Sequence, residues 1–188
     1  MRIEAEHTAA LVIDYQEKLV PVMHEKENLI CQSDILLRGL NVLGIPMFLT
    51  QQYTKGLGET VNEITTAAGT EEYVEKISFS AYEGVKEKIR DKKYIIICGI
   101  ETHICVLQTV IDLKAAGFIP VIVENCVSSR KEDDKKIALQ RMKEEGAIIT
   151  TYESVLFELL KEAWTEKSKK IQRLIKSVSY THLTLPTN

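Results

Sequence analysis

Short apolar runs recur along the chain and are separated by turn residues. They are rich in Ile and Val and continuous rather than alternating, so each predicts a strand that is buried on both faces. These runs lie at residues 9–13, 46–50, 94–98, 119–123 and 147–150. A short alternating stretch at residues 73–82 predicts an edge strand as well.

Amphipathic segments fill the gaps between the predicted strands. Their apolar side chains follow helical spacing, which predicts helices that end at Gly44, Gly117 and Gly146. Thr102 is the expected N-cap of the second of these helices. Ser129 is the expected N-cap of the third, because a glutamate follows it three residues later.

The alternation of strand and helix predicts an α/β fold. Parallel strands joined by right-handed crossovers place helices on both faces of a sheet. We therefore expect a doubly wound, Rossmann-like three-layer sandwich with a mostly parallel sheet of about six strands. Residues 1–177 are predicted to form a single domain. Residues 178–188 contain no Lys, Arg, Asp or Glu, and we interpret them as a tail that can be non-native.

Composition narrows the classes of partner. The chain has 188 residues and a net charge of −3, with 24 basic and 27 acidic residues interspersed. This pattern gives no basic stripe for nucleic acid, and no apolar segment is long enough to span a membrane. We therefore expect a small-molecule substrate, with neither nucleic acid nor membrane as a partner. The four cysteines form no CxxC pair and no secretory signal is visible, so we expect a cytoplasmic location, with an organellar address left open.

Cys105 is the leading candidate for chemistry. It follows the apolar run at residues 94–98, which Gly99 is expected to end, and it falls in the first turn after Thr102. A helix N-terminus carries partial positive charge and can lower the pKa of a cysteine, which favours a nucleophile. Cys98 is expected to be inert core by comparison. From these residues alone, a purely structural role for Cys105 stays open.

Asp14 and Lys76 are candidate catalytic residues because of their positions relative to the predicted strands. Asp14 directly follows the first buried strand, where a carboxylate can act as a general base or simply cap a turn. Lys76 lies in the predicted edge strand, where a solvated surface charge is the ordinary interpretation. If Lys76 points into the same cleft, its cation would stabilise the carboxylate of Asp14 and a thiolate of Cys105.

The segment at residues 99–106, GIETHICV, resembles the G-φ-x-T-x-x-C-V signature of the isochorismatase-like cysteine hydrolases, a group that includes nicotinamidases and N-carbamoylsarcosine amidases. Catalytic residues of that family follow the chain order Asp, Lys, Cys, which matches Asp14, Lys76 and Cys105. Residues 52–58 and 128–130 resemble the isochorismatase domain-containing proteins, although a threonine stands where that subgroup usually has proline. The resemblance covers roughly residues 8–177.

The resemblance implies a chemistry and a backbone geometry. It implies a hydrolase that cleaves a small amide or related C–N bond through a thioester on Cys105, with Asp14 and Lys76 as the other catalytic residues. It also implies a cis peptide between Ile100 and Glu101. The backbone amides of Glu101 and Cys105 would then form an oxyanion hole.

The resemblance also bears on ligands and partners. Gln16, Tyr53 and Phe79 are the expected substrate-binding residues, and a homo-oligomer, a dimer or larger, is the expected assembly. The region after the second strand lacks the Asp-x-His motif with which related nicotinamidases bind metal, so no metal and no cofactor are expected. Two alternatives stay open, a binding or scaffold protein without turnover and a nicotinamidase-type amidase with metal.

Overall fold

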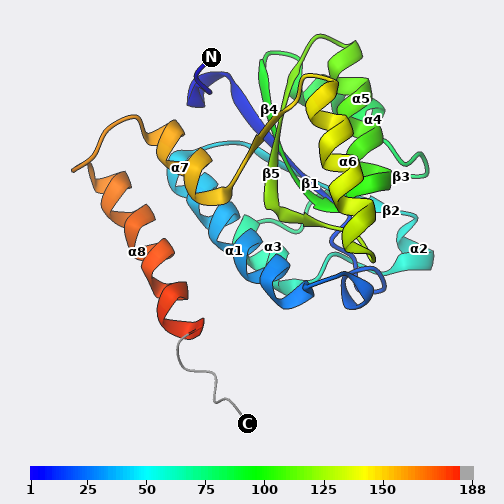
Figure 1. The fold of residues 1–188 in the computed structure, drawn as a ribbon, viewed down its shortest axis with the longest axis horizontal. Helices are drawn as coiled ribbons and strands as arrows, with labels where there is room; N and C mark the ends of the chain where they lie inside the picture. Colours follow the sequence, from blue (N-terminus) through cyan, green and yellow to red (C-terminus); the bar gives the residue numbers. More distant parts are fainter. Residues whose placement is uncertain (183–188) are drawn as a thin grey trace.

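The computed structural model describes residues 1–182, with side chains to residue 177. Six strands form one sheet in which every neighbouring pair is parallel, and the order is β3-β2-β1-β4-β5-β6 (Figure 1). The strands are β1 (Thr8–Ile13), β2 (Met47–Gln52), β3 (Tyr73–Lys76), β4 (Tyr94–Ile100), β5 (Ile119–Ser128) and β6 (Ile148–Thr150). The predicted parallel α/β sheet of about six strands is confirmed, including an edge strand at β3.

Helices cover both faces of the sheet (Figure 1). Apolar side chains of four helices pack on one face, namely α1 (Lys26–Leu43), α3 (Asn62–Ala68), α7 (Tyr152–Leu160) and α8 (Glu166–His182). The other face is covered by α4 (Tyr82–Ile89), α5 (Leu107–Ala115) and α6 (Glu132–Glu144). Short elements complete the described chain, namely η1 (Ala5–His7), η2 (Val20–Val22), α2 (Thr54–Leu57) and the π-helical turn η3 (Thr102–Val106).

Strand β1 shows why the sheet has two apolar faces. Ala10 and Val12 belong to the core under α1, whereas Leu11 and Ile13 belong to the core under α5. Successive side chains of a strand point to opposite faces, so a strand buried on both sides must be apolar throughout. The continuous apolar runs in the sequence are therefore explained by a middle layer that has no wet face.

The position of β1 in the sheet also places the functional edge. β2 lies on one side of β1 and β4 on the other, so the winding of the chain reverses between β1 and β4. Ligands of doubly wound sheets bind at the carboxyl ends of the strands at such a reversal. Asp14 follows β1 at this edge, and Glu101 follows β4 beside it.

Gly99 does not end the strand as the sequence predicted. β4 continues to Ile100, with a register shift against β5 between Ile97 and Gly99. Gly99 has φ +135°, a conformation that glycine adopts readily, and a Cβ atom there would overlap the carbonyl group of Ile13. The glycine therefore lets β4 pass close to β1 just before the turn that carries Cys105.

Two predictions about helix ends also need correction or restriction. α6 begins at Glu132, and Ser129 is no N-cap because its hydroxyl contacts the ring of His103 instead. α8 continues to His182, so residues 178–182 of the predicted tail are helical, while residues 183–188 lie outside the described part of the chain.

Every helix within residues 1–182 is too short or too polar to cross a bilayer.

The close approach at Gly99 gives a stability prediction. Gly99→Ala should lower the free energy of unfolding by about 3–5 kcal/mol, because the new methyl group meets the Ile13 backbone and the residue keeps an unfavourable φ. Urea denaturation followed by circular dichroism measures this loss.

Gly44→Ala is the matched control. Gly44 ends α1 with φ +76°, and nothing lies within 4 Å of a Cβ atom built there, so only the backbone penalty of about 1–2 kcal/mol applies. Equal losses for the two substitutions would contradict the steric role given to Gly99.

Candidate active site

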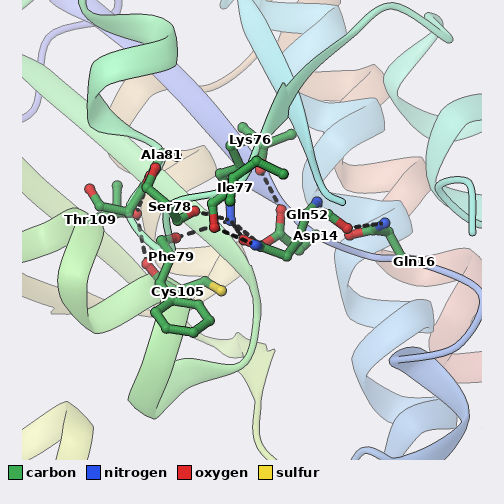
Figure 2. Close-up of polar contacts among 12 residues, drawn as sticks. Asp14, Gln16, Gln52, Lys76, Ile77, Ser78, Phe79, Ala81, Cys105 and Thr109 are labelled. Carbon is green, nitrogen blue, oxygen red and sulfur yellow. Dashed lines mark hydrogen bonds and ion pairs between the residues drawn. The ribbon is translucent and has the colours of Figure 1, made fainter. Parts of the chain in front are cut away.

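Asp14 stands at the centre of a polar cluster at the carboxyl edge of the sheet. Its side chain is fully buried, and its φ of 54° turns the chain sharply as β1 ends. Oδ1 accepts a hydrogen bond of 2.7 Å from Thr50 Oγ1. Oδ2 accepts one of 2.6 Å from Lys76 Nζ (Figure 2). A carboxylate can be buried in this way only because both of its oxygens have strong partners.

Lys76 is the last residue of edge strand β3, and its ammonium group is buried. Besides the carboxylate of Asp14, Nζ has three further acceptors, namely Gln52 Oε1 at 2.8 Å, the Phe79 carbonyl at 3.0 Å and the Ser78 carbonyl at 3.4 Å. An ammonium group has three protons, so all of its donors are in use. The structure thus excludes the ordinary interpretation of Lys76 as a solvated surface charge.

Cys105 lies in the π-helical turn η3 between β4 and α5, with 6% of its surface exposed. Burial and the neighbouring Asp14 carboxylate raise the pKa of its thiol to about 12, while the Lys76 cation acts in the opposite direction. The expected lowering of the pKa by a helix start is therefore wrong, because desolvation of the thiolate outweighs it. The free site holds a protonated thiol next to a carboxylate.

The other cysteines show what distinguishes Cys105. Burial raises the pKa of Cys98 to about 12, and it raises the pKa of Cys126, which lies within β5, well above its ordinary value. Cys31 lies on α1, where partial burial also raises its pKa. Among these four thiols, Cys105 is the one whose pKa responds to both Asp14 and Lys76.

The turn before Cys105 is tied to the loop after β5. The peptide bond between Ile100 and Glu101 is cis. The Glu101 carboxylate accepts hydrogen bonds of 3.1 Å from both the backbone N–H and Nε of Arg130. Thr102 is not a helix cap; its hydroxyl is buried and finds no partner among the described residues. These contacts fix the backbone from which Cys105 projects.

The three expected substrate-binding residues are placed differently. Gln16 is fully buried, and its amide group binds the backbone N–H and carbonyl of Gln52 and the carbonyl of Gly58, which favours a positioning role over substrate contact. Tyr53 and Phe79 are about half exposed. Both residues are hydrogen-bonded to Lys76 through their backbones. The Tyr53 N–H donates to the Lys76 carbonyl, and the Phe79 carbonyl accepts from Lys76 Nζ.

Sequence reasoning missed three polar residues of this cluster. Thr50 and Gln52 are two positions apart on β2, so both side chains face the same side, where they reach Asp14 and Lys76 respectively. Their alternating spacing beside the Asp14 strand was the available signal. Thr109 sits on α5, accepts from the Ala81 N–H at 2.9 Å and donates to the Cys105 carbonyl at 2.7 Å. Nothing in the sequence distinguishes it from an ordinary helix threonine.

The residues at the carboxyl end of β2 do not fit a metal ion. The side chain of Gln51 is bonded to Thr60 and Thr54, and that of Gln52 bridges Lys76 and the Ile77 carbonyl. Metals of hydrolase sites prefer imidazole and carboxylate ligands. Within the described part of the chain, no three His, Cys, Asp or Glu side chains are grouped to hold a metal.

A buried carboxylate, a paired ammonium group and a protonated thiol therefore meet at one edge of the sheet. In such a cluster, the thiol proton can pass to the carboxylate when sulfur attacks an electrophilic carbon. The net charge of the buried cluster does not change in this transfer. The lysine pairs with the carboxylate and orients it.

Comparison with known proteins finds a matching domain family and related proteins. A model of the isochorismatase domain matches residues 8–154. Isochorismatase domain-containing protein 2 of Danio rerio is 36% identical over 178 residues, covering 93% of this chain and 89% of the relative.

Solved structures agree on the fold. MAR1 ribonuclease from Caenorhabditis elegans has a TM-score of 0.88 at 33% identity, over 94% of this chain and 93% of that one. The YcaC structure from Escherichia coli, described as an octameric hydrolase of unknown specificity, has a TM-score of 0.85 at 22% identity, over 98% of both chains. By the domain match and by its relatives, the chain belongs to the isochorismatase domain family.

Proposed function

We propose that the protein is a hydrolase that cleaves a small amide or related C–N bond through a thioester on Cys105, without a metal. The observation that carries this proposal is the fully buried Asp14 carboxylate, which is held by Thr50 and Lys76 and raises the pKa of the Cys105 thiol. A thiol with a pKa of about 12 is a weak nucleophile unless a base removes its proton during attack. Asp14 is the base within reach.

The proposed reaction has two halves. In the first, Asp14 accepts the Cys105 proton as sulfur bonds to the carbonyl carbon, and it then returns that proton to the leaving amine as the C–N bond breaks. In the second, Asp14 takes a proton from water as the water oxygen bonds to the thioester carbon. The C–S bond then breaks, and Asp14 returns that proton to sulfur, which releases the acid and restores the thiol. The backbone amides of Glu101 and Cys105 would hold the oxyanion in both halves.

A second candidate activity comes from the relative of 33% identity that is described as a ribonuclease. We favour the amide because a thiol suits attack on an acyl carbon, and because the acidic balance of the chain does not favour a polyanion. RNA cleavage that survives Cys105→Ala in the purified protein, with no amide hydrolysis detected, would support the ribonuclease instead.

We also propose that the chain forms a homo-oligomer, as the octameric Escherichia coli neighbour does. Light scattering coupled to size exclusion should then give a mass of at least two chains. A mass of one chain at micromolar concentration would contradict this proposal.

Cys105→Ala should lower amide hydrolysis by about a thousandfold or more, because the thioester cannot form. A panel of small amides and carbamoyl compounds identifies the substrate, and mass spectrometry after an acid quench detects the acyl adduct on the peptide that carries Cys105. Cys31→Ala is the control and should keep both activity and adduct. Hydrolysis at the wild-type rate in Cys105→Ala would overturn the mechanism, and absence of any turnover or adduct would support the scaffold alternative.

Asp14→Asn should change two quantities in opposite directions. The pKa of Cys105 should fall below about 12, because the carboxylate that raises it is gone while Lys76 remains, so more thiolate is present near neutral pH. Hydrolysis should nevertheless fall by about 10²–10⁴-fold, because the general base is lost.

The pH dependence of alkylation at Cys105 measures the first quantity, and steady-state turnover measures the second. Asp133→Asn, an exposed change in the first turn of α6, is the control and should alter neither. Thermal melts show whether Asp14→Asn is folded. A folded Asp14→Asn variant with wild-type turnover would exclude Asp14 as the base.

A further inference from the structure

The segment between β3 and α4, residues 77–81, is irregular, yet side chains hold its backbone in place. We call it the cover segment. Gln52 Nε2 donates to the Ile77 carbonyl at 2.6 Å, and Lys76 Nζ donates to the carbonyls of Ser78 and Phe79. The Ser80 carbonyl accepts from Ser78 Oγ at 2.8 Å. Four successive carbonyls are thus bound, two of them by the candidate catalytic lysine.

The other end of the cover segment is linked by hydrogen bonds to the turn that carries Cys105. Ala81 N–H donates to Thr109 Oγ1, and Thr109 donates in turn to the backbone carbonyl of Cys105 (Figure 2). Thr109 is fully buried, so water does not compete for these two bonds. The cover segment therefore connects the Lys76 side chain with the Cys105 turn, and its conformation is fixed by the same groups that build the site.

The side chains of the cover segment contrast with this polar backbone. None of the five is charged, and the two large ones are apolar and exposed, Ile77 at 72% and Phe79 at 52%. In the view of Figure 2 the ring of Phe79 is drawn on the Cys105 side of the cluster. Exposed apolar side chains on a backbone that is fixed by the residues of a candidate site are typical of a ligand-binding surface.

We propose that Phe79 is a specificity-determining residue of the Cys105 site, and that its ring packs against an apolar substituent of a small, uncharged amide. This inference rests on the proposed function, because it requires Cys105 to be the reacting thiol. Lys76 links Phe79 to the reacting groups, since its Nζ binds both the Asp14 carboxylate and the Phe79 carbonyl. The Phe79 backbone is held in place before substrate arrives, so little backbone conformational entropy is lost on binding.

Two alkylating reagents that differ in one apolar group test this inference on the full chain, before any substrate is known. Iodoacetamide and N-benzyliodoacetamide both form a bond from Cys105 Sγ to carbon as the carbon–iodine bond breaks; iodide leaves, and the thiol proton passes to Asp14 or to solvent. Peptide mass spectrometry gives the rate at Cys105, and each rate is divided by the rate of the same reagent with glutathione. The ratio of the two reagents at one pH does not depend on the ionisation of the thiol.

In the wild-type protein the benzyl reagent should be favoured by about five- to tenfold, which is the contribution of a packed aromatic pair. Phe79→Ala should reduce the preference to near unity, and Phe79→Leu should retain part of it. Phe157→Ala is the matched control, because Phe157 is 39% exposed on α7, which packs on the other face of the sheet. It should keep the full preference.

The outcomes separate this inference from the proposed function. Labelling of Cys105 without any benzyl preference, or with a preference that persists in Phe79→Ala, would overturn the role of Phe79 and leave Cys105 as the nucleophile. If neither reagent labels Cys105 in the folded protein while Cys31 reacts, the proposed function fails and this inference fails with it.

Discussion

The buried ion pair between Asp14 and Lys76 is the interaction on which the site depends. It joins the end of β1, near the middle of the sheet, to the end of edge strand β3 across β2, with 2.6 Å between Nζ and Oδ2. A buried pair of this kind contributes little to stability by itself, because desolvation of both charges offsets their attraction. Removal of either partner leaves the charge of the other uncompensated in the core, which strongly destabilises the fold. Each of the two residues is therefore needed to keep the other one buried. Thr50 donates to the other oxygen of Asp14, and Gln52 and the carbonyls of residues 78 and 79 accept from the ammonium group.

The chemistry of the site follows from the same pair. Burial raises the pKa of the Cys105 thiol to about 12, and the neighbouring Asp14 carboxylate acts in the same direction, so Cys105 stays protonated when the site is free. The cluster of thiol, carboxylate and ammonium then carries no net charge, and it is compatible with burial. Transfer of the thiol proton to Asp14 leaves a thiolate beside Lys76, which is again neutral overall. In the proposed mechanism, the pair would thus allow a nucleophile to form in the core without an unpaired charge.

The sequence predicted the sheet and the three central residues, but not how they are held. Continuous apolar runs predicted the five strands β1, β2, β4, β5 and β6, because a layer covered on both faces is predominantly apolar. Asp14, Lys76 and Cys105 came from a motif and its chain order, which a sequence shows directly. Gly99 was misread as a strand end, because its positive φ serves the contact with Ile13, which is 86 positions away in the chain. Gln16 was predicted to bind substrate and Thr109 was not predicted at all, because each binds backbone groups that only the folded chain brings near.

The electrostatics of the cluster also bear on the substrate. Lys76 has all its donors in use, and one of its acceptors is the Phe79 carbonyl, so a substrate anion would have to displace a bond that holds the site together. The Asp14 carboxylate adds a repulsion that an anion near Cys105 would feel at low dielectric. An uncharged amide meets neither obstacle, and its carbonyl oxygen acquires charge only as sulfur attacks. In the proposed mechanism, the ion pair would therefore also favour a neutral reacting group beside the thiol.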